Sequence, residues 1–317
     1  MTGGRIGIMA ALLASVLAPE RSFAASALSQ NAAAEGQSCY HDVTDGKYSA
    51  AVTDCTQAIA LNSKDESAYD NRCIAYRNQE NYSAAVADCT QAITLNSQDA
   101  IAYENRCDAY INLGNYGGAI TDCTQAIALD PKYEKAYVNR CVMYDTLGDY
   151  DAAVADCTHA ITLNPQDAIA YENRCDAYIN LGNYNLAVTD CTQAIALNSK
   201  DESAYNNRCI AFRNQENYSA AVADCSQAII LNSRDASAYF DLGSAYYGQG
   251  NYAAAVNNYT TATRLWPNYA DAYGNRGLAY EKMGSNAQAL ADFQKALTMD
   301  PSNQTAQNEL KRLGVSP

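Results

Sequence analysis

The cysteines are the residues of this chain whose type and spacing most directly suggest chemistry. The 317-residue sequence contains 12 cysteines in six pairs, and the two members of each pair are 16 residues apart. The pairs are Cys39 and Cys55, Cys73 and Cys89, Cys107 and Cys123, Cys141 and Cys157, Cys175 and Cys191, and Cys209 and Cys225. Two sulfurs per pair do not complete a four-ligand metal site. No Cys-x-x-Cys motif of a thiol oxidoreductase is present. The spacing favours disulfides, with reduced, buried cysteine as the alternative.

Other residue types that commonly perform catalysis form no recognisable site. The only histidines are His41 and His159, and His159 stands where other copies of the same segment have Gln. The sequence has no Gly-rich phosphate loop, no metal-ligand spacing and no nucleophile elbow. Because the acidic residues follow a repeat, no single pair stands out as acid and base. We therefore predict no enzymatic activity, no cofactor and no bound metal.

The positions of the cysteines follow a 34-residue repeat. The segment YENRCDAYINLGNY occurs twice without change, from Tyr103 and from Tyr171, which are 68 residues apart. Alignment at half that interval gives units near 36–65, 66–99, 100–133, 134–167, 168–201, 202–235, 236–269 and 270–303. A periodic array of this kind is one continuous structure.

Each unit carries the signals of two helices joined by a tight turn. In the second unit we expect helices from about Ser67 to Asn78 and from about Ser83 to Leu95. Glycines mark the turn between the helices in most units: Gly46, Gly114, Gly148, Gly182, Gly250 and Gly284. Aspartates precede the first helix of a unit, where they can cap its amide groups: Asp65, Asp99, Asp167, Asp201 and Asp235. Prolines end the second helix of four units: Pro131, Pro165, Pro267 and Pro301.

Small residues recur on one face of the second helix. Positions 20 and 27 of the unit are Ala in every unit, as in Ala85 and Ala92. Residues seven apart lie on the same helix face, so these alanines allow a neighbouring helix to approach closely. Tyrosines at positions 4 and 11, such as Tyr103 and Tyr110, supply the bulk between units.

The pattern resembles the tetratricopeptide repeat over about 270 residues. Gly243 and Gly277 stand where that family usually has Gly or Ala, and Tyr259 and Phe293 stand at its usual aromatic position. The resemblance implies an all-α fold, an α-α superhelix (solenoid) of about eight helix-turn-helix repeats. Gln304 to Leu313 resembles a solvating cap helix, with Ala306, Leu310 and Leu313 on one face, so the solenoid would cover residues 36–314. The first unit departs from the pattern, since its first helix is short.

The cysteine positions predict one disulfide within each hairpin. In an antiparallel helix pair whose turn lies near position 15, residues whose positions sum to about 31 face each other. The cysteines occupy positions 8 and 24. The last two units lose both cysteines together and have Gly243 with Tyr259 and Gly277 with Phe293. Pairing between successive units would leave Cys39 and Cys225 unpaired.

A second pair of positions also changes jointly. Position 7 is Arg in six units: Arg72, Arg106, Arg140, Arg174, Arg208 and Arg276. Position 23 is Asp in the same six units: Asp88, Asp122, Asp156, Asp190, Asp224 and Asp292. The seventh unit has Leu242 and Asn258 and so loses both. We expect an ion pair across each hairpin, the alternative being two independent surface charges.

The resemblance implies that the first helices line a concave groove for a peptide or partner segment. Position 6 forms an asparagine series resembling the ladder that some members use: Asn71, Asn105, Asn139, Asn173, Asn207 and Asn275, with Asp241 in the seventh unit. An amide can donate to and accept from a peptide backbone at once. The alternative is a hydrogen bond within the repeat array itself.

The other expected groove positions are acidic and apolar. The acidic ones are Glu104, Asp108, Asp145, Glu172 and Asp176, and the apolar ones are Ile74, Ile101, Val142, Ile169 and Ile210. Lys135, Arg77 and Arg213 are the basic exceptions. We expect a protein or peptide partner with basic and apolar residues. The family's carboxylate clamp needs Lys and Arg clustered with Asn, and no such cluster is evident.

The net charge and the N-terminal residues indicate the class of partner and the cellular compartment. A net charge of -14 argues against nucleic acid and against an anionic membrane surface. Residues 1–24 read as a secretory signal peptide, with Arg5 before an apolar stretch and a cleavage point after Ser22-Phe23-Ala24 or, alternatively, after Ala25-Ser26-Ala27. An uncleaved anchor is the other interpretation. After a signal peptide over 1–24, we expect residues 25–35 to be a flexible N-terminal segment. We predict a periplasmic or secreted protein with no membrane span after cleavage, in a compartment where disulfides persist.

The function predicted from the sequence is a non-enzymatic protein-binding scaffold. Two other interpretations remain: a structural spacer of the cell envelope, and a thiol-disulfide active protein that reacts through exposed, strained disulfides. The sequence predicts neither the partner nor the oligomeric state.

Overall fold

The computed structural model describes residues 30–315, and these residues contain helices and no strand. A helix over 30–44 precedes α2. The others are α2 (Tyr48–Leu61), α3 (Glu66–Asn78), α4 (Tyr82–Leu95), α5 (Ala100–Asn112), α6 (Tyr116–Leu129), α7 (Glu134–Thr146), α8 (Tyr150–Leu163), α9 (Ala168–Asn180), α10 (Tyr184–Leu197), α11 (Glu202–Asn214), α12 (Tyr218–Leu231), α13 (Ala236–Gly248), α14 (Tyr252–Leu265), α15 (Ala270–Lys282), α16 (Asn286–Met299) and α17 (Gln304–Arg312). The predicted all-α solenoid of helical repeats is confirmed.

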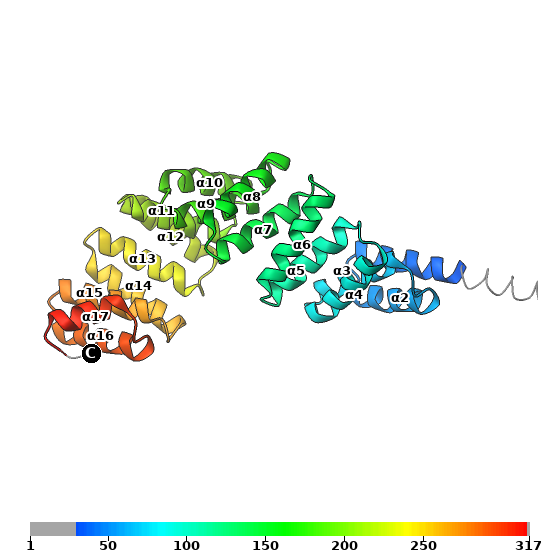
Figure 1. The fold of residues 1–317 in the computed structure, drawn as a ribbon. Coiled ribbons are helices and arrows are strands. Elements are labelled where there is room, and N and C mark those ends of the chain that lie inside the picture. The colour runs from blue at the N-terminus through cyan, green and yellow to red at the C-terminus, as the bar shows by residue number, and fades with distance from the viewer. Residues whose placement is uncertain (1–29, 316–317) are drawn as a thin grey trace, which may run out of the picture. The chain divides into compact units, whose positions relative to one another are not determined.

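The chain divides into two compact units, residues up to 143 and residues from 144. Within each unit a helix packs against its neighbour in sequence to form a hairpin, and each hairpin packs against the next (Figure 1). The first helices of hairpins start at residues expected from the repeat, among them Glu66, Ala100, Ala168 and Ala236. The stacking therefore follows the 34-residue period.

The beginning of the chain differs from expectation in one respect. The sequence predicts a flexible segment over 25–35, but residues 30–35 are helical and continue without a break to residue 44. The first helix is thus not short. Its Ala32 is 7% exposed and Cys39 is fully buried, so packing against the array holds this helix. The predicted signal peptide and residues 25–29 lie outside the described residues, in which no helix is long and apolar enough to cross a membrane.

The helix ends are fixed by the residues that the sequence indicated. All five predicted aspartates accept hydrogen bonds from amides of the helix that follows. The six turn glycines have φ between 73° and 82°. Glu80 and Glu216 adopt φ 60° at the same place in the two hairpins that lack the glycine.

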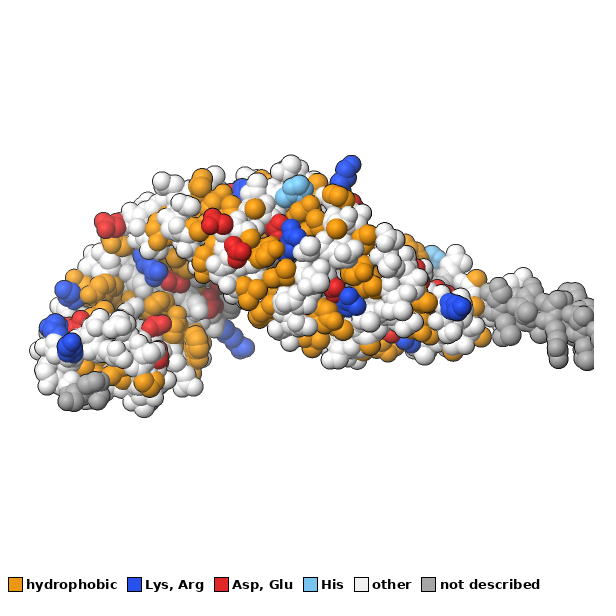
Figure 2. Space-filling view, viewed as in Figure 1, with side chains coloured by type: hydrophobic (Ala, Val, Ile, Leu, Met, Phe, Trp, Pro, Cys, Tyr) orange, Lys and Arg blue, Asp and Glu red, His pale blue; other side chains and the backbone are white. Residues whose placement is uncertain are grey.

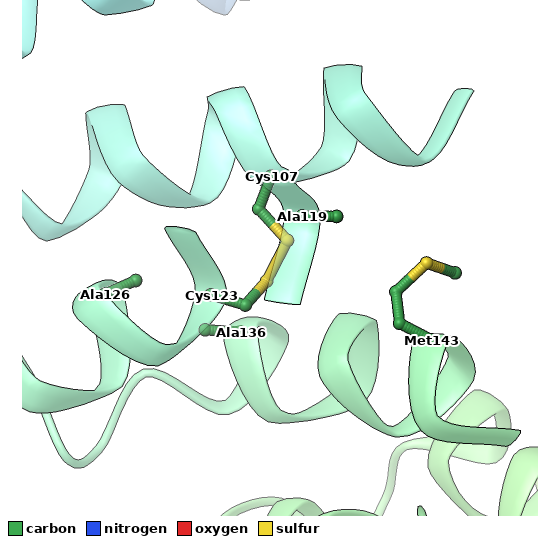
Figure 3. Packing of buried hydrophobic residues seen from close by; sticks show 6 residues of the cluster. All are labelled: Cys107, Ala119, Cys123, Ala126, Ala136 and Met143. Carbon is green, nitrogen blue, oxygen red and sulfur yellow. A yellow bond between two sulfur atoms is a disulfide. The ribbon is translucent and has the colours of Figure 1, made fainter. Parts of the chain in front are cut away.

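The core of each hairpin is built from small residues and sulfur. Figure 3 shows the Cys107–Cys123 disulfide between α5 and α6, with Ala119 and Ala126 nearby. Five bridges join cysteines 16 apart, with Cα atoms 5.0 to 5.6 Å apart. Cys141 and Cys157 are also disulfide-bonded. All 12 cysteines are fully buried, and the described residues include no free cysteine.

An aromatic ring on glycine takes the place of the disulfide in the last two hairpins. Tyr259 and Phe293 are 1% and 0% exposed. A Cβ atom on Gly243 would lie 2.8 Å from the Tyr259 ring, and one on Gly277 would lie 2.6 Å from the Phe293 ring. A ring and a cysteine therefore cannot occupy these facing positions together, which explains why both residues change jointly.

The predicted Arg–Asp pairs cross the hairpins beside the disulfides. Arg106 donates from Nε and Nη2 to the two carboxylate oxygens of Asp122, at 2.7 and 2.8 Å. Equivalent bidentate bonds join Arg72 to Asp88, Arg174 to Asp190, Arg208 to Asp224 and Arg276 to Asp292. The prediction of an ion pair is confirmed for these five units.

The same guanidinium also links neighbouring hairpins, which was not predicted. Nη1 of Arg106 donates to Oγ1 of Thr90 in the preceding unit, at 3.0 Å. The equivalent bonds are made by Arg72, Arg140, Arg174, Arg208 and Arg276 to Thr56, Thr124, Thr158, Thr192 and Thr260. Leu242, which replaces the arginine, follows a unit that has Ser226 at the threonine position. This third joint replacement is the sequence signal that could have revealed the link.

The first prediction concerns the disulfides. A Cys107→Ser, Cys123→Ser variant should lose about 3 kcal/mol of stability, because the bridge closes a 16-residue separation in the unfolded chain. Amide hydrogen exchange in α5 and α6 should quicken relative to α15 and α16, which lack a disulfide and serve as the internal control. Unchanged exchange in α5 would contradict the prediction.

The second prediction concerns the Arg–Asp pairs. Asp190→Asn should cost about 2 kcal/mol, because it leaves the partly buried Arg174 guanidinium without a counter-charge. The matched control is the double variant Arg174→Leu, Asp190→Asn, which copies the seventh unit and should be more stable than the single variant. Denaturant midpoints measured on the amides of α9 and α10 show which variant is more stable. A double variant less stable than the single one would refute the prediction.

Candidate partner-binding surface

The first helices of the hairpins form the inner face within each compact unit. Contacts occur between α3 and α5, between α9 and α11, between α11 and α13, and between α13 and α15. Within the units, the second helices α4 and α6, and α10 and α12, do not contact one another. A stack whose first helices are closer together than its second helices curves toward the first helices. The predicted groove positions lie on these first helices.

Half of the asparagine series is used to join neighbouring hairpins. The Nδ2 atoms of Asn105, Asn139 and Asn207 donate to Asp70, Glu104 and Glu172 of the preceding unit, at 3.2, 3.0 and 3.0 Å. Asp241 at the same position accepts from Asn206, at 3.3 Å. These side chains follow the alternative interpretation of the series, a hydrogen bond within the array.

The other three asparagines have free amides. Asn71, Asn173 and Asn275 are partly exposed and make no side-chain hydrogen bond within residues 30–315. Their preceding units offer Gly36, Val138 and Phe240 at position 5, where the paired asparagines find a polar side chain. The residue at position 5 of one unit therefore decides whether the next asparagine is occupied.

Glu104 and Asp108, the predicted acidic groove positions of the first compact unit, are paired with basic side chains. Glu104 is 1% exposed. Its Oε1 lies 2.8 Å from Nζ of Lys135, and its Oε2 accepts from the Tyr133 hydroxyl at 3.1 Å. Arg77 lies between Glu104 and Asp108, with Nη1 3.9 Å from the former and 3.2 Å from the latter. These basic residues are thus engaged and are not free to clamp a carboxylate ligand.

The equivalent carboxylates of the second compact unit, Glu172 and Asp176, lack basic partners within residues 30–315. Glu172 accepts a hydrogen bond from Asn207 but forms no ion pair in the described part of the chain. Burial, followed by the charge of Asp201 and of other carboxylates, raises the pKa of Glu172 to about 8. Burial, followed by the charge of Asp145, raises the pKa of Asp176 to about 6. Ionisation of Glu172 and Asp176 is therefore unfavourable unless a cation lies next to them.

An aromatic cavity lies where the disulfides end. It has a volume of about 310 Å³ and lies between α11, α13, α14 and α15. It is lined by Arg213, Phe240, Ser244, Tyr247, Tyr259, Asn275 and Leu278. The Tyr259 hydroxyl donates to Ser244 at 3.1 Å, and Arg213 donates to the buried Asp241 at 2.8 Å. The free amide of Asn275 thus lies beside an apolar wall that sequence analysis did not identify.

The predicted apolar positions differ in exposure. Ile101 and Ile169, at the start of α5 and α9, are 51% and 60% exposed, whereas Ile74, Val142 and Ile210 are half-buried. On the face seen in Figure 2, apolar side chains are interspersed among polar ones over the hairpins. Both histidines are exposed. The described residues contain no cluster of three His, Cys, Asp or Glu able to hold a metal ion.

Sequence comparison identifies the repeat. Family models described as tetratricopeptide repeat match residues 67–99, 100–133, 134–167, 168–201 and 240–304, and a model described as TPR repeat matches residues 210–250. No curated protein matches the chain.

Solved structures share the fold. The crystal structure of the APC/C hetero-tetramer Cut9-Hcn1 aligns with a TM-score of 0.67 at 18% identity, covering 84% of this chain and 52% of that chain. This chain therefore spans about half the length of that neighbour. A tetratricopeptide repeat protein from Parabacteroides merdae gives 0.59 at 19% identity, covering 79% and 99%. PilF of Pseudomonas aeruginosa gives 0.58 at 15% identity, covering 67% and 97%.

The third prediction follows from the two acidic environments. The pKa of Glu172 is about 8 in the folded chain, against 4.5 as the ordinary value. The contribution of Glu172 to stability is complete below pH 4.5 and is lost as the pH rises through about 8. Glu172→Gln should therefore raise stability at pH 9 by at least about 1 kcal/mol and leave it nearly unchanged at pH 4.

Glu104→Gln is the matched control, because Glu104 occupies the position of Glu172 in the identical segment that begins at Tyr103. It should lower stability at pH 9, since Lys135 and Arg77 lose their shared counter-charge. Thermal unfolding of both variants across this pH range measures the two effects. Stability changes of the same sign for both variants at pH 9 would contradict the prediction, because they would show that Glu172 and Glu104 have similar electrostatic surroundings.

Proposed function

Because the chain belongs to the tetratricopeptide repeat family, we propose that it is a non-enzymatic scaffold whose first helices, within a compact unit, hold a peptide or an extended segment of another protein. Tetratricopeptide repeats are typically interaction scaffolds. The candidate surface is formed by the first helices, which present amides, carboxylates and apolar side chains at the repeat interval. None of these groups needs to react in order to bind a partner.

The free amides of Asn71, Asn173 and Asn275 carry this proposal. An amide that is partly exposed and unpaired can both donate to and accept from the backbone of an extended peptide. Asn275 also lies at the aromatic cavity of α13 and α15, where an apolar side chain of the peptide can enter. The paired asparagines, by contrast, stabilise the stacking that holds the free ones in place.

We also propose that the chain is exported, to a periplasm or outside the cell. The composition of residues 1–24 supports this, and so do the disulfides, because such bonds persist in oxidising compartments. Complete burial of the sulfur atoms supports a structural role for them over thiol exchange, since an attacking thiolate needs access to a sulfur.

The fourth prediction tests the binding surface. Peptides selected from a displayed random library against the purified protein should bind at least tenfold more weakly to the variant Asn71→Ala, Asn173→Ala, Asn275→Ala. The reason is that this variant removes only amides that have no side-chain partner within residues 30–315. Fluorescence anisotropy with the selected peptides gives the affinities.

Ile230→Ala is the control on the other face. Ile230 lies on α12, a second helix, and is 74% exposed, so its truncation should leave peptide affinity unchanged. A selection that yields no peptides, or peptides insensitive to the asparagine variant, would contradict the proposal and favour a structural spacer.

A further inference from the structure

We propose that Asp145, Glu172 and Asp176 form a site for a lysine or arginine side chain supplied by the protein partner. This inference rests on the proposed function, which it deepens by naming the chemistry of the partner segment. Asp145 lies near the end of α7, and Glu172 and Asp176 lie one turn apart on α9. The three residues belong to the second compact unit.

The chain contains its own comparison for this site. The segment from Tyr103 to Tyr116 is identical to that from Tyr171 to Tyr184, so Glu104 and Asp108 correspond to Glu172 and Asp176. The residues around the two segments differ. Where the first segment has Arg77 in the preceding unit and Lys135 in the following one, the second has Asp145 and Ser203.

The first segment shows which ligand this arrangement of carboxylates takes. Nζ of Lys135 lies 2.8 Å from Glu104, and Nη1 of Arg77 lies 3.2 Å from Asp108. An ammonium and a guanidinium from adjacent helices thus occupy the space above the two carboxylates. The same helix and the same two side chains recur on α9, where Asp145 and Ser203 replace the two cations.

The second segment carries extra negative charge in place of those cations. The carboxylates acting on Glu172 include Asp201, which replaces Tyr133, and Asp145, which replaces Arg77. Asp145 accepts a hydrogen bond from Asn180 at 3.3 Å, and Asn207 donates to Glu172. These amides orient the carboxylates but do not neutralise them.

The occupant is a basic side chain of a protein segment. The acidic groups of the described residues do not converge closely enough to hold a metal ion, whereas a long, flexible lysine can reach carboxylates that lie apart. Asn173, whose amide is free, follows Glu172 directly on α9. A peptide lying along this face would therefore find a backbone partner next to the site for its basic side chain.

The fifth prediction uses the chain's own substitutions as the test. The probes are an acetylated, amidated peptide with one lysine among alanines and the same peptide with norleucine in place of lysine. In NMR titrations, the lysine peptide should shift the side-chain carboxyl signals of Glu172 and Asp176 and bind at least tenfold more tightly than the norleucine peptide.

The variant Asp145→Arg, Ser203→Lys gives the second segment the cations of the first. It should abolish the preference for lysine while remaining folded, because this combination already exists around Glu104. Conversely, Arg77→Asp, Lys135→Ser should create a second lysine site at Glu104 and Asp108. This gain of binding distinguishes a specific site from general attraction to an acidic chain.

The outcomes separate this inference from the proposed function. Equal affinity for the two probes, or a lysine preference that survives Asp145→Arg, Ser203→Lys, would overturn the inference while peptides selected from the library still bind the asparagine surface. Loss of that library binding would overturn the proposed function instead. Failure of both probes to shift Glu172 would also overturn the inference.

Discussion

The close approach of two helices within each hairpin is the constraint on which the rest of the structure depends. Bridged Cα atoms lie 5.0 to 5.6 Å apart, and helices can approach this closely only where their facing residues are small. Fully buried alanines such as Ala85 and Ala92 flank each bridge. Because small residues bury little apolar area, the disulfide is what holds the two helices of the hairpin together. Where the sulfurs are absent, Tyr259 or Phe293 covers a glycine and restores buried apolar area.

The hairpins are held to one another by a second, polar device. Five of the repeated arginines each join their own hairpin through an aspartate and the preceding hairpin through a threonine, and each lies near two aromatic rings, as Arg106 lies near Tyr103 and Tyr110. One side chain thus fixes both the angle within a hairpin and the step to the next. This regularity lets the inner face vary in charge from unit to unit while the geometry below it stays constant.

The repeat made most of the fold predictable from sequence. Helix starts, capping aspartates, turn glycines and facing cysteines all recur at fixed intervals, so one unit suffices to place the others. The helix over 30–35 was missed because its residues carry no repeat signal before Cys39. The candidate surface was only partly predictable. The asparagine series was visible, but whether an asparagine is free depends on position 5 of another unit, as with Asp70 beside Asn105 and Phe240 before Asn275.

Two identical segments in different surroundings show where recognition can arise in such an array. The residues from Tyr103 and from Tyr171 have the same propensities, the same hairpin and the same disulfide. The electrostatic surroundings of their glutamates nevertheless differ. Glu104 forms an ion pair with Lys135, whereas Glu172 is surrounded by the charges of further carboxylates such as Asp201. A chemical property that differs between identical segments must come from the neighbouring units. Under the proposed function, selectivity would therefore be a property of adjacent repeats taken together, set by the substitutions that separate one copy from the next.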